Sequence, residues 1–264
     1  MRGSQRLKRP VWLPPGVPVE FPDPSDYDDQ GLVAVGADLR PERLLSAYHA
    51  GIFPWFDEPP ILWWSPNPRA VLDPEHLHIS RSLRRHLRGA ARSGELTVRA
   101  TTDIEEVMRT CGQLRESSWI NDEMLSAYVE LGRLGKALAY EVRRGAELVG
   151  GLYGVLSGGL FAAESMFHIE TDASKAALVT SVLHRFALGT RLYDVQFETG
   201  HLRSMGAYEI SRSEYLIRLS QALSGSPPAN PAGALTSETG PEAQEISSLG
   251  TDLLPWVVRK LEVL

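Results

Sequence analysis

The spacing of apolar residues between positions 138 and 197 predicts a compact run of elements. Residues 138–142, 148–156 and 160–167 are mostly apolar, have the length of strands and are separated by two turn signals. Residues 173–188 repeat apolar side chains every three or four positions, which predicts a helix. A fourth strand is expected at residues 192–197. The order strand, strand, strand, helix, strand is the clearest pattern in the chain.

The last of these strands carries a polar pair. Alternate side chains on a strand share a face, so Asp194 and Gln196 are expected on one side. Tyr193, Val195 and Phe197 are expected on the other. A carboxylate beside an amide in an apolar context indicates a functional site. An edge strand with one solvated face has the same pattern, and the spacing alone favours that interpretation.

Shorter elements are expected around this unit. The apolar pattern predicts helices at residues 41–50, 78–92, 103–113, 122–134 and 211–223, and a strand at residues 95–100. Proline interrupts the aromatic-rich runs 51–56 and 61–72, so neither can form a long regular element. Residues 224–250 lack aromatic side chains and are rich in small and polar ones, which predicts disorder. A terminal helix within residues 253–264 is expected to dock weakly or not at all.

Composition narrows the class of protein. With 43% hydrophobic residues, the 264-residue chain can bury a core of one large domain or two smaller ones. Cys111 is the single cysteine, which excludes an internal disulfide and fits a reducing compartment. No apolar run reaches about 18 residues, and the basic N-terminus lacks an apolar signal core. We therefore expect a cytoplasmic protein without a membrane segment.

A basic stripe stands out against the net charge of −6. Four arginines recur at three- and four-residue steps on the predicted helix 78–92, and no acid occurs between Glu75 and Glu95. A run of charges on a helix is usually interpreted as a solvent-exposed face. Because the like charges repel one another, an anionic partner such as phosphate is the alternative that we favour. The arginines are Arg81, Arg84, Arg85 and Arg88.

Several strings then match one known family. Residues 62–66 read Leu-Trp-Trp-Ser-Pro and residues 164–167 read Glu-Ser-Met-Phe. Others lie at residues 51–56, 68–72, 77–82, 118–120, 150–155, 173–175, 194–196, 201 and 204–207. In this order, over about residues 21–220, they resemble the leucyl/phenylalanyl-tRNA–protein transferases. The Trp-Trp-Ser-Pro and Glu-Ser-Met-Phe strings are the specific ones.

The resemblance implies an α+β fold in a soluble monomer without cofactor or metal. A small N-terminal α/β domain, residues 1–70, would precede a domain at residues 71–223 with the fold of the GNAT acyltransferases, a mixed sheet flanked by helices. Residues 224–264 form the tail. The implied activity moves leucine or phenylalanine, with methionine as a further donor, from aminoacyl-tRNA to proteins that begin with Arg or Lys. The new N-terminus marks those proteins for degradation.

The resemblance also assigns residues. It implies that Asp194, Gln196 and Glu164 are catalytic. Because an amide does not titrate near neutral pH, we interpret Gln196 as a positioning group whose amide Asp194 holds, and Asp194 as the better proton acceptor. Glu164 is expected to hold the amino group of the donor or the cationic acceptor residue.

Binding residues follow from the same resemblance. The side chain of the donor amino acid is expected among Leu152, Phe161, Leu178 and Tyr193, and the terminal adenosine at Trp55 and Trp119. The arginine stripe would contact phosphates of the acceptor stem. The chain departs from the family at Ser181, where members carry Phe, and at Tyr193, where an aliphatic residue is common. We therefore expect an altered pocket.

Two other functions remain open from the residues alone. An acyl-CoA-dependent acyltransferase on the same fold would need a glycine-rich pyrophosphate turn before the helix, and residues 171–175 do not have that pattern. A non-catalytic RNA-binding protein would explain the arginines and tryptophans but not Glu164, Asp194 and Gln196. His76 and His78 have no third ligand nearby, so a metal site is not expected.

Overall fold

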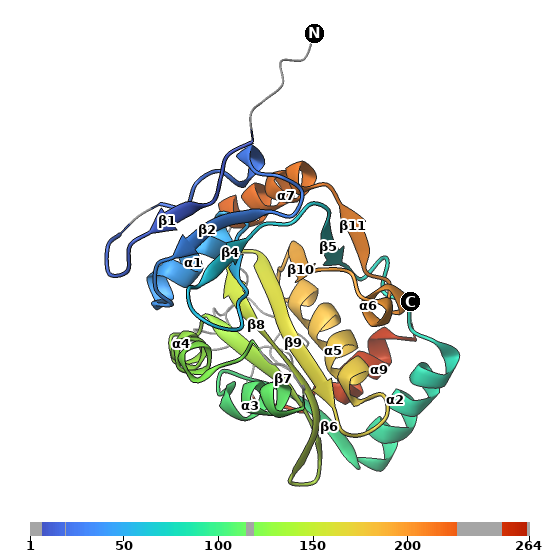
Figure 1. The fold of residues 1–264 in the computed structure, drawn as a ribbon. Coiled ribbons are helices and arrows are strands. Elements are labelled where there is room, and N and C mark those ends of the chain that lie inside the picture. Colours follow the sequence, from blue (N-terminus) through green and yellow to red (C-terminus); the bar gives the residue numbers. More distant parts are fainter. Residues whose placement is uncertain (1–6, 19, 115–118, 226–249, 263–264) are drawn as a thin grey trace.

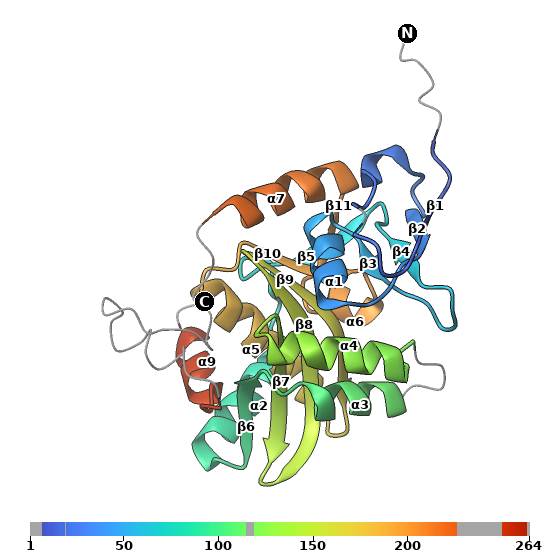
Figure 2. The ribbon, with the colours of Figure 1, turned by 90° about the vertical axis from the view of Figure 1, so that its left-hand side faces the viewer.

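The computed structural model describes residues 7–18, 20–114, 119–225 and 250–262. Two β-sheets lie side by side in it, and helices cover both faces of the larger sheet (Figures 1 and 2). Among the described residues, no helix has the length and apolar character needed to cross a membrane.

The smaller sheet is built by the first part of the chain. Its strand order is β1-β2-β4-β3, with β1 parallel to β2 and the other neighbours antiparallel. Proline lies within or beside β3 and β4 and keeps both strands short, as predicted. The elements are β1 (Val11–Leu13), the 3-10 helix η1 (Pro24–Asp26), β2 (Leu32–Gly36), α1 (Pro41–His49), β3 (Phe53–Pro54) and β4 (Leu62–Trp64).

The larger sheet has seven strands in the order β11-β5-β10-β9-β8-β7-β6. Only the pair of β10 and β9 is parallel among its described neighbours, so the sheet is mixed. The crossover between these two strands is the helix α5 (Ala173–Ala187). The strands are β5 (Arg69–Leu72), β6 (Leu96–Thr101), β7 (Ala137–Arg144), β8 (Glu147–Ser157), β9 (Leu160–His168), β10 (Leu192–Gln196) and β11 (Tyr208–Ile210).

Helices divide between the two faces of this sheet (Figure 2). The pair α3 and α4 packs on one face, and α2, α5 and α9 pack on the other. The first turn of α5 can lie directly on β8 because residue 150 is glycine: a Cβ there would meet the Cβ of Ala173 at 2.5 Å. The helices are α2 (Arg81–Ser93), α3 (Glu105–Gln113), α4 (Asp122–Arg133), α5 (Ala173–Ala187), α6 (Gly200–Ser204), α7 (Arg212–Ser224) and α9 (Leu254–Lys260).

The mixed α/β fold and the predicted order of elements between residues 138 and 197 are confirmed. The prediction for the terminal helix was wrong. Trp256, Leu254 and Val257 of α9 are buried against α2 and α5, and the backbone of Leu253 donates a hydrogen bond to Val98 of β6. Apolar burial therefore anchors this helix. Disorder was predicted for residues 224–250; residues 226–249 lie outside the described residues, and Ser224 is the last residue of α7. The domain boundary near residue 70 stays a prediction.

Candidate active site

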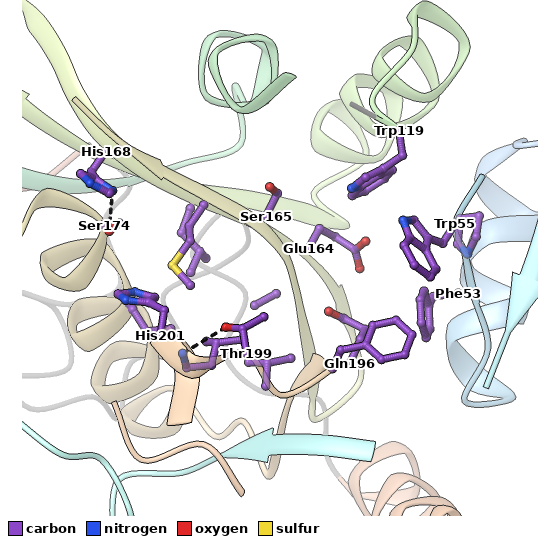
Figure 3. Close-up of a pocket in the computed structure, with 18 of the residues that line it drawn as sticks. Phe53, Trp55, Trp119, Glu164, Ser165, His168, Ser174, Gln196, Thr199 and His201 are labelled. Carbon is purple, nitrogen blue, oxygen red and sulfur yellow. Dashed lines mark hydrogen bonds between the residues drawn. The ribbon is translucent and has the colours of Figure 1, made fainter. Parts of the chain in front are cut away.

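A pocket of about 640 Å³ opens where the small sheet meets β8, β9, β10 and α5. Figure 3 shows aromatic side chains at one end of the pocket, histidines at the other, and Glu164 between them. The aromatic lining residues are Phe53, Trp55, Trp119 and Phe197, and the histidines are His168 and His201. A cavity of this size accommodates a small organic ligand.

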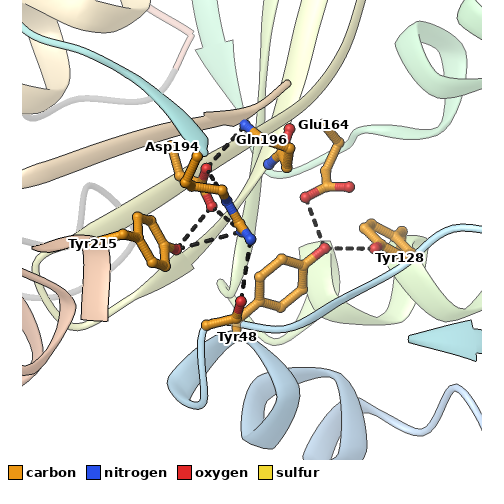
Figure 4. Close-up of polar contacts among 8 residues, drawn as sticks. Tyr48, Tyr128, Glu164, Asp194, Gln196 and Tyr215 are labelled. Carbon is orange, nitrogen blue, oxygen red and sulfur yellow. Dashed lines mark hydrogen bonds and ion pairs between the residues drawn. The ribbon is translucent and has the colours of Figure 1, made fainter. Parts of the chain in front are cut away.

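Glu164 on β9 is half-buried and lines this pocket. The hydroxyl of Tyr48, from α1, donates a hydrogen bond of 2.7 Å to its Oε1. A further bond of 2.6 Å joins the hydroxyls of Tyr48 and Tyr128 (Figure 4). Burial raises the pKa of Glu164 to about 8, although the bond from Tyr48 acts in the opposite direction. The carboxyl group can therefore gain or lose a proton near neutral pH.

Asp194 on β10 has a different environment, since it is fully buried and paired with Arg69. Arg69 donates from Nε to Oδ1 at 2.9 Å and from Nη2 to Oδ2 at 2.6 Å, and the hydroxyl of Tyr215 donates to Oδ2 at 2.9 Å (Figure 4). The guanidinium lies between the rings of Phe53 and Tyr215, 4.6 and 4.5 Å from their centroids. Burial acts most strongly and would lower the pKa of Arg69, but Asp194, Tyr215 and Glu164 together outweigh it and raise that pKa. The ion pair is thus a sealed anchor between β5 and β10.

Our prediction for how Asp194 holds Gln196 was wrong in detail. Oδ1 of Asp194 accepts the backbone N–H of Gln196 at 2.9 Å, and the side-chain amide is held elsewhere. In the amide orientation that satisfies its neighbours, Nε2 donates to the carbonyl oxygens of Val195 at 3.1 Å and Ala163 at 2.9 Å. The carboxylate therefore shapes the backbone at Gln196, and backbone carbonyls hold its amide.

A bulge overrides the expected alternation on β10. The register with β5 shifts between Asp194 and Gln196, and Gln196 has a φ of 58°, in the left-handed region. Val195, Gln196 and Phe197 consequently all line the pocket, whereas Asp194 does not. Side-chain periodicity predicts a regular strand and cannot anticipate such a bulge, which often redirects a side chain beside an active site.

The predicted adenosine-binding residues, Trp55 and Trp119, both lie in the pocket lining. The indole of Trp55 is 44% exposed, and its ring centroid lies 5.4 Å from that of Phe197. Phe53 packs edge-on against Phe197 at 5.8 Å. Together these rings form an accessible aromatic wall on which a planar group can stack. Trp63, by contrast, is fully buried in the small-sheet core.

The four predicted pocket residues divide into two pairs. Leu152 and Leu178 line the cavity, and Met166, which the prediction missed, lies beside them. Phe161 and Tyr193 are fully buried outside the lining, with ring centroids 5.1 Å apart. Tyr193, where we expected an altered pocket, is therefore buried behind the residues that line the cavity and does not face the cavity itself.

The two departures from the family contact each other. The hydroxyls of Ser181 and Tyr193 are 2.7 Å apart, and both residues are fully buried. Ser181 also lies within hydrogen-bond distance of the Leu178 carbonyl, at 2.9 Å. The small residue on the helix makes room for the large one on the strand, and the hydroxyl pair satisfies both polar groups.

The arginine stripe lies on α2, away from the pocket lining. Arg81 and Arg85 are exposed, whereas Arg84 and Arg88 are half-buried. Arg84 donates a hydrogen bond to the carbonyl of Leu261 beyond α9. Ser80 caps the helix by accepting the backbone N–H of Leu83 at 3.1 Å, as predicted. Arg81 and Arg85 are thus open to solvent, and Arg84 is engaged with the C-terminal segment.

Sequence reasoning missed Tyr48, Arg69 and Tyr215. Arg69 stands in the apolar run Pro-Arg-Ala-Val-Leu, and a charge in such a buried segment signals a buried partner. The two tyrosines occur at apolar positions of helices and carried no separate signal. Their hydroxyls become informative only when the fold places them against carboxylates.

A mixed α/β fold with an acid of raised pKa beside an apolar, aromatic-walled pocket indicates a class of protein, an enzyme that acts on organic substrates. Family models agree with this class. The model described as leucyl/phenylalanyl-tRNA protein transferase matches residues 71–220, and the model of its N-terminal domain matches residues 37–67.

Relatives of the same description cover most of the chain. A leucyl/phenylalanyl-tRNA–protein transferase of Anaeromyxobacter sp. (strain K) is 50% identical over 81% of this chain and 92% of its own length. One of Shewanella baltica (strain OS223) is 46% identical over 83% of this chain and 92% of its own. Among solved structures, an aminoglycoside acetyltransferase from an uncultured soil sample covers 56% of this chain at 9% identity, with a TM-score of 0.32. The chain belongs to the leucyl/phenylalanyl-tRNA–protein transferase family and is an aminoacyltransferase.

Proposed function

We propose that this enzyme moves leucine, phenylalanine or methionine from aminoacyl-tRNA to the N-terminal amine of proteins that begin with Arg or Lys, and so marks them for degradation. The observation that supports it best is the position of Glu164 at the centre of a pocket with an apolar side and an aromatic side. An apolar pocket discriminates between substrates by only about 1–3 kcal/mol for each methylene by which they differ. We therefore expect it to accept the side chains of leucine, phenylalanine and methionine.

The reaction needs orientation and one proton transfer. The acceptor amine attacks the ester carbonyl, a C–N bond forms, and the C–O bond to the ribose breaks. Glu164 takes the proton that the amine loses and returns it to the departing ribose oxygen, which balances the step. Its pKa of about 8 suits both halves of this exchange. This assignment moves the role of proton acceptor from Asp194, which does not line the pocket, to Glu164.

Neighbouring groups orient the reactants. The Oε1 of Gln196 accepts a hydrogen bond from the incoming amine. The Nε2 of Gln196 is held by the backbone carbonyls of Val195 and Ala163. Asp194 acts as a positioning residue through Arg69 and the backbone of Gln196. Leu152, Met166 and Leu178 surround the side chain of the donor. Fixing the amine against the ester accounts for much of the acceleration in such a reaction.

We assign the tRNA to the aromatic wall and to α2. Trp55 and Trp119 stack on the terminal adenosine, since base–aromatic stacking is favourable for any base. Exposed Arg81 and Arg85 contact acceptor-stem phosphates, which position the tRNA without reading its sequence. Arg85→Glu should weaken tRNA binding at low salt, measured by filter binding. Unchanged affinity would remove α2 from the interface.

A transfer assay tests the whole proposal. Purified protein is mixed with radiolabelled Leu-tRNA, Phe-tRNA or Met-tRNA and with matched peptides that begin with Arg, Lys or Ala. Label should move to the Arg and Lys peptides and not to the Ala peptide. Leucyl-CoA serves as the control donor. Transfer from the thioester but not from the tRNA, or equal transfer to all three peptides, contradicts the proposal.

A further inference from the structure

The histidine end of the pocket has no part in the chemistry proposed above. His168 comes from the end of β9, His201 from α6 and Ser174 from the first turn of α5. All three line the cavity, and Figure 3 shows them together, away from Trp55 and Trp119. Nδ1 of His168 and the hydroxyl of Ser174 are 3.4 Å apart. Three segments that are separate in sequence thus present hydrogen-bonding side chains to one part of the pocket.

This end of the pocket offers hydrogen-bonding groups beside a neighbouring positive charge. Burial lowers the pKa of His201, and the neighbouring charges of Lys175 and His168 lower it further. The nearby acid Asp172 is bound to Lys175, with 2.7 Å between Oδ1 and Nζ. Nε2 of His201 is sealed from solvent and has no hydrogen-bond partner among the described residues. An anionic ligand with several acceptor oxygens would satisfy this nitrogen when it carries a hydrogen.

We propose that His168, Ser174 and His201 bind a phosphate group, namely the 5′-phosphate of the donor's terminal adenosine. The inference rests on the proposed function, which brings the 3′ end of an aminoacyl-tRNA into this pocket. Ser174 lies one turn before Leu178 on the same face of α5, so the site adjoins the apolar pocket for the amino acid. In the donor, the ester and this phosphate are carried by the same ribose.

Binding of unreactive donor analogues tests the site. Phenylalanine joined to adenosine by an amide is prepared with and without a 5′-phosphate, and both affinities are measured by calorimetry. The native enzyme should bind the phosphorylated analogue about tenfold more tightly, the value of one charge-assisted hydrogen bond. His201→Ala should reduce this preference to less than about twofold and bind the unphosphorylated analogue as before. Equal affinities in the native enzyme, or an undiminished preference in His201→Ala, would overturn the proposal.

Two further variants distinguish the loss of the phosphate site from a general loss of structure in His201→Ala. His201→Gln places an amide nitrogen near the position of Nε2 and should retain part of the phosphate preference. His86→Ala replaces an exposed histidine on α2 outside the pocket and should retain all of it. Thermal unfolding of each variant checks that it is folded. A His86→Ala variant that lost the preference as fully as His201→Ala would contradict the assignment.

Transfer with ester-linked donors distinguishes this proposal from the proposed function. Native enzyme that uses phosphorylated and unphosphorylated aminoacyl-adenosine equally well on an Arg peptide keeps the function and loses the phosphate site. Absence of transfer from either donor, with the phosphate preference in binding intact, removes the proposed function and leaves the phosphate site in place.

Discussion

Asp194 and Glu164 are carboxylates on the neighbouring strands β10 and β9, and they differ in the groups that surround them. Asp194 receives two hydrogen bonds from Arg69, one from Tyr215 and one from the backbone of Gln196. Glu164 accepts from Tyr48 and forms no ion pair among the described residues. These bonds fix the carboxylate of Asp194 in one position, whereas burial without a cationic partner raises the pKa of Glu164 and favours its neutral form. The first therefore suits anchoring, and the second suits proton transfer.

Removal of the guanidinium should have the largest effect on stability. Arg69→Met leaves the charge of Asp194 buried without its partner, and the free energy of unfolding should fall by about 3–5 kcal/mol. Urea denaturation followed by circular dichroism measures the change. The double variant Arg69→Met/Asp194→Leu is the control, because replacing both charges by apolar groups costs less than removing one. A single variant as stable as the native enzyme would show that the pair is not an anchor.

Neutralising the other carboxylate should act on rate and leave stability almost unchanged. Glu164→Gln removes the proton acceptor, and kcat/KM should fall by about 10²–10⁴-fold in the peptide transfer assay. The pH profile gives a sharper test. With a raised pKa of about 8, the native carboxyl becomes ionised, and active as a base, as pH rises through 8.

The acceptor amine loses its proton over a similar range, with a solution pKa of about 7.7–8.0. Native kcat/KM should therefore rise with pH through two ionisations, and that of Glu164→Gln through one. Identical profiles in the two enzymes would exclude Glu164 as the base.

The hydroxyl that holds Glu164 should have a smaller effect. Its bond to the carboxylate lowers the pKa of Glu164 against the effect of burial, so Tyr48→Phe should raise that pKa further. The midpoint of the pH profile then moves upward, and activity at pH 7 falls by up to about tenfold for one pKa unit. Tyr27→Phe is a matched control, because that buried hydroxyl has no partner among the described residues. A profile unmoved in Tyr48→Phe would show that the bond does not tune Glu164.

Some features of the fold depend on residues that are close in sequence, and others depend on residues that are far apart. The periodicity of residues 138–197 predicted three strands, a helix and a fourth strand, and all five form. The cap at Ser80 was predicted equally well, because caps and apolar spacing act within a few residues. The terminal helix showed its apolar pattern too, but nothing local to it indicated the surface of α2 and α5 that buries it.

The sequence by itself thus determined the elements, the order of the family strings and the identity of the two acids. Only the tertiary structure decided which acid faces the pocket. Arg69 lies 125 positions from Asp194, and Tyr48 lies 116 positions from Glu164. The first pairing depends on how β5 and β10 pair within the larger sheet, and the second on how α1 packs against that sheet. The bulge at Gln196 likewise arises from pairing with β5. Side-chain spacing reports neighbours along the chain, whereas charge compensation and pKa depend on neighbours in space.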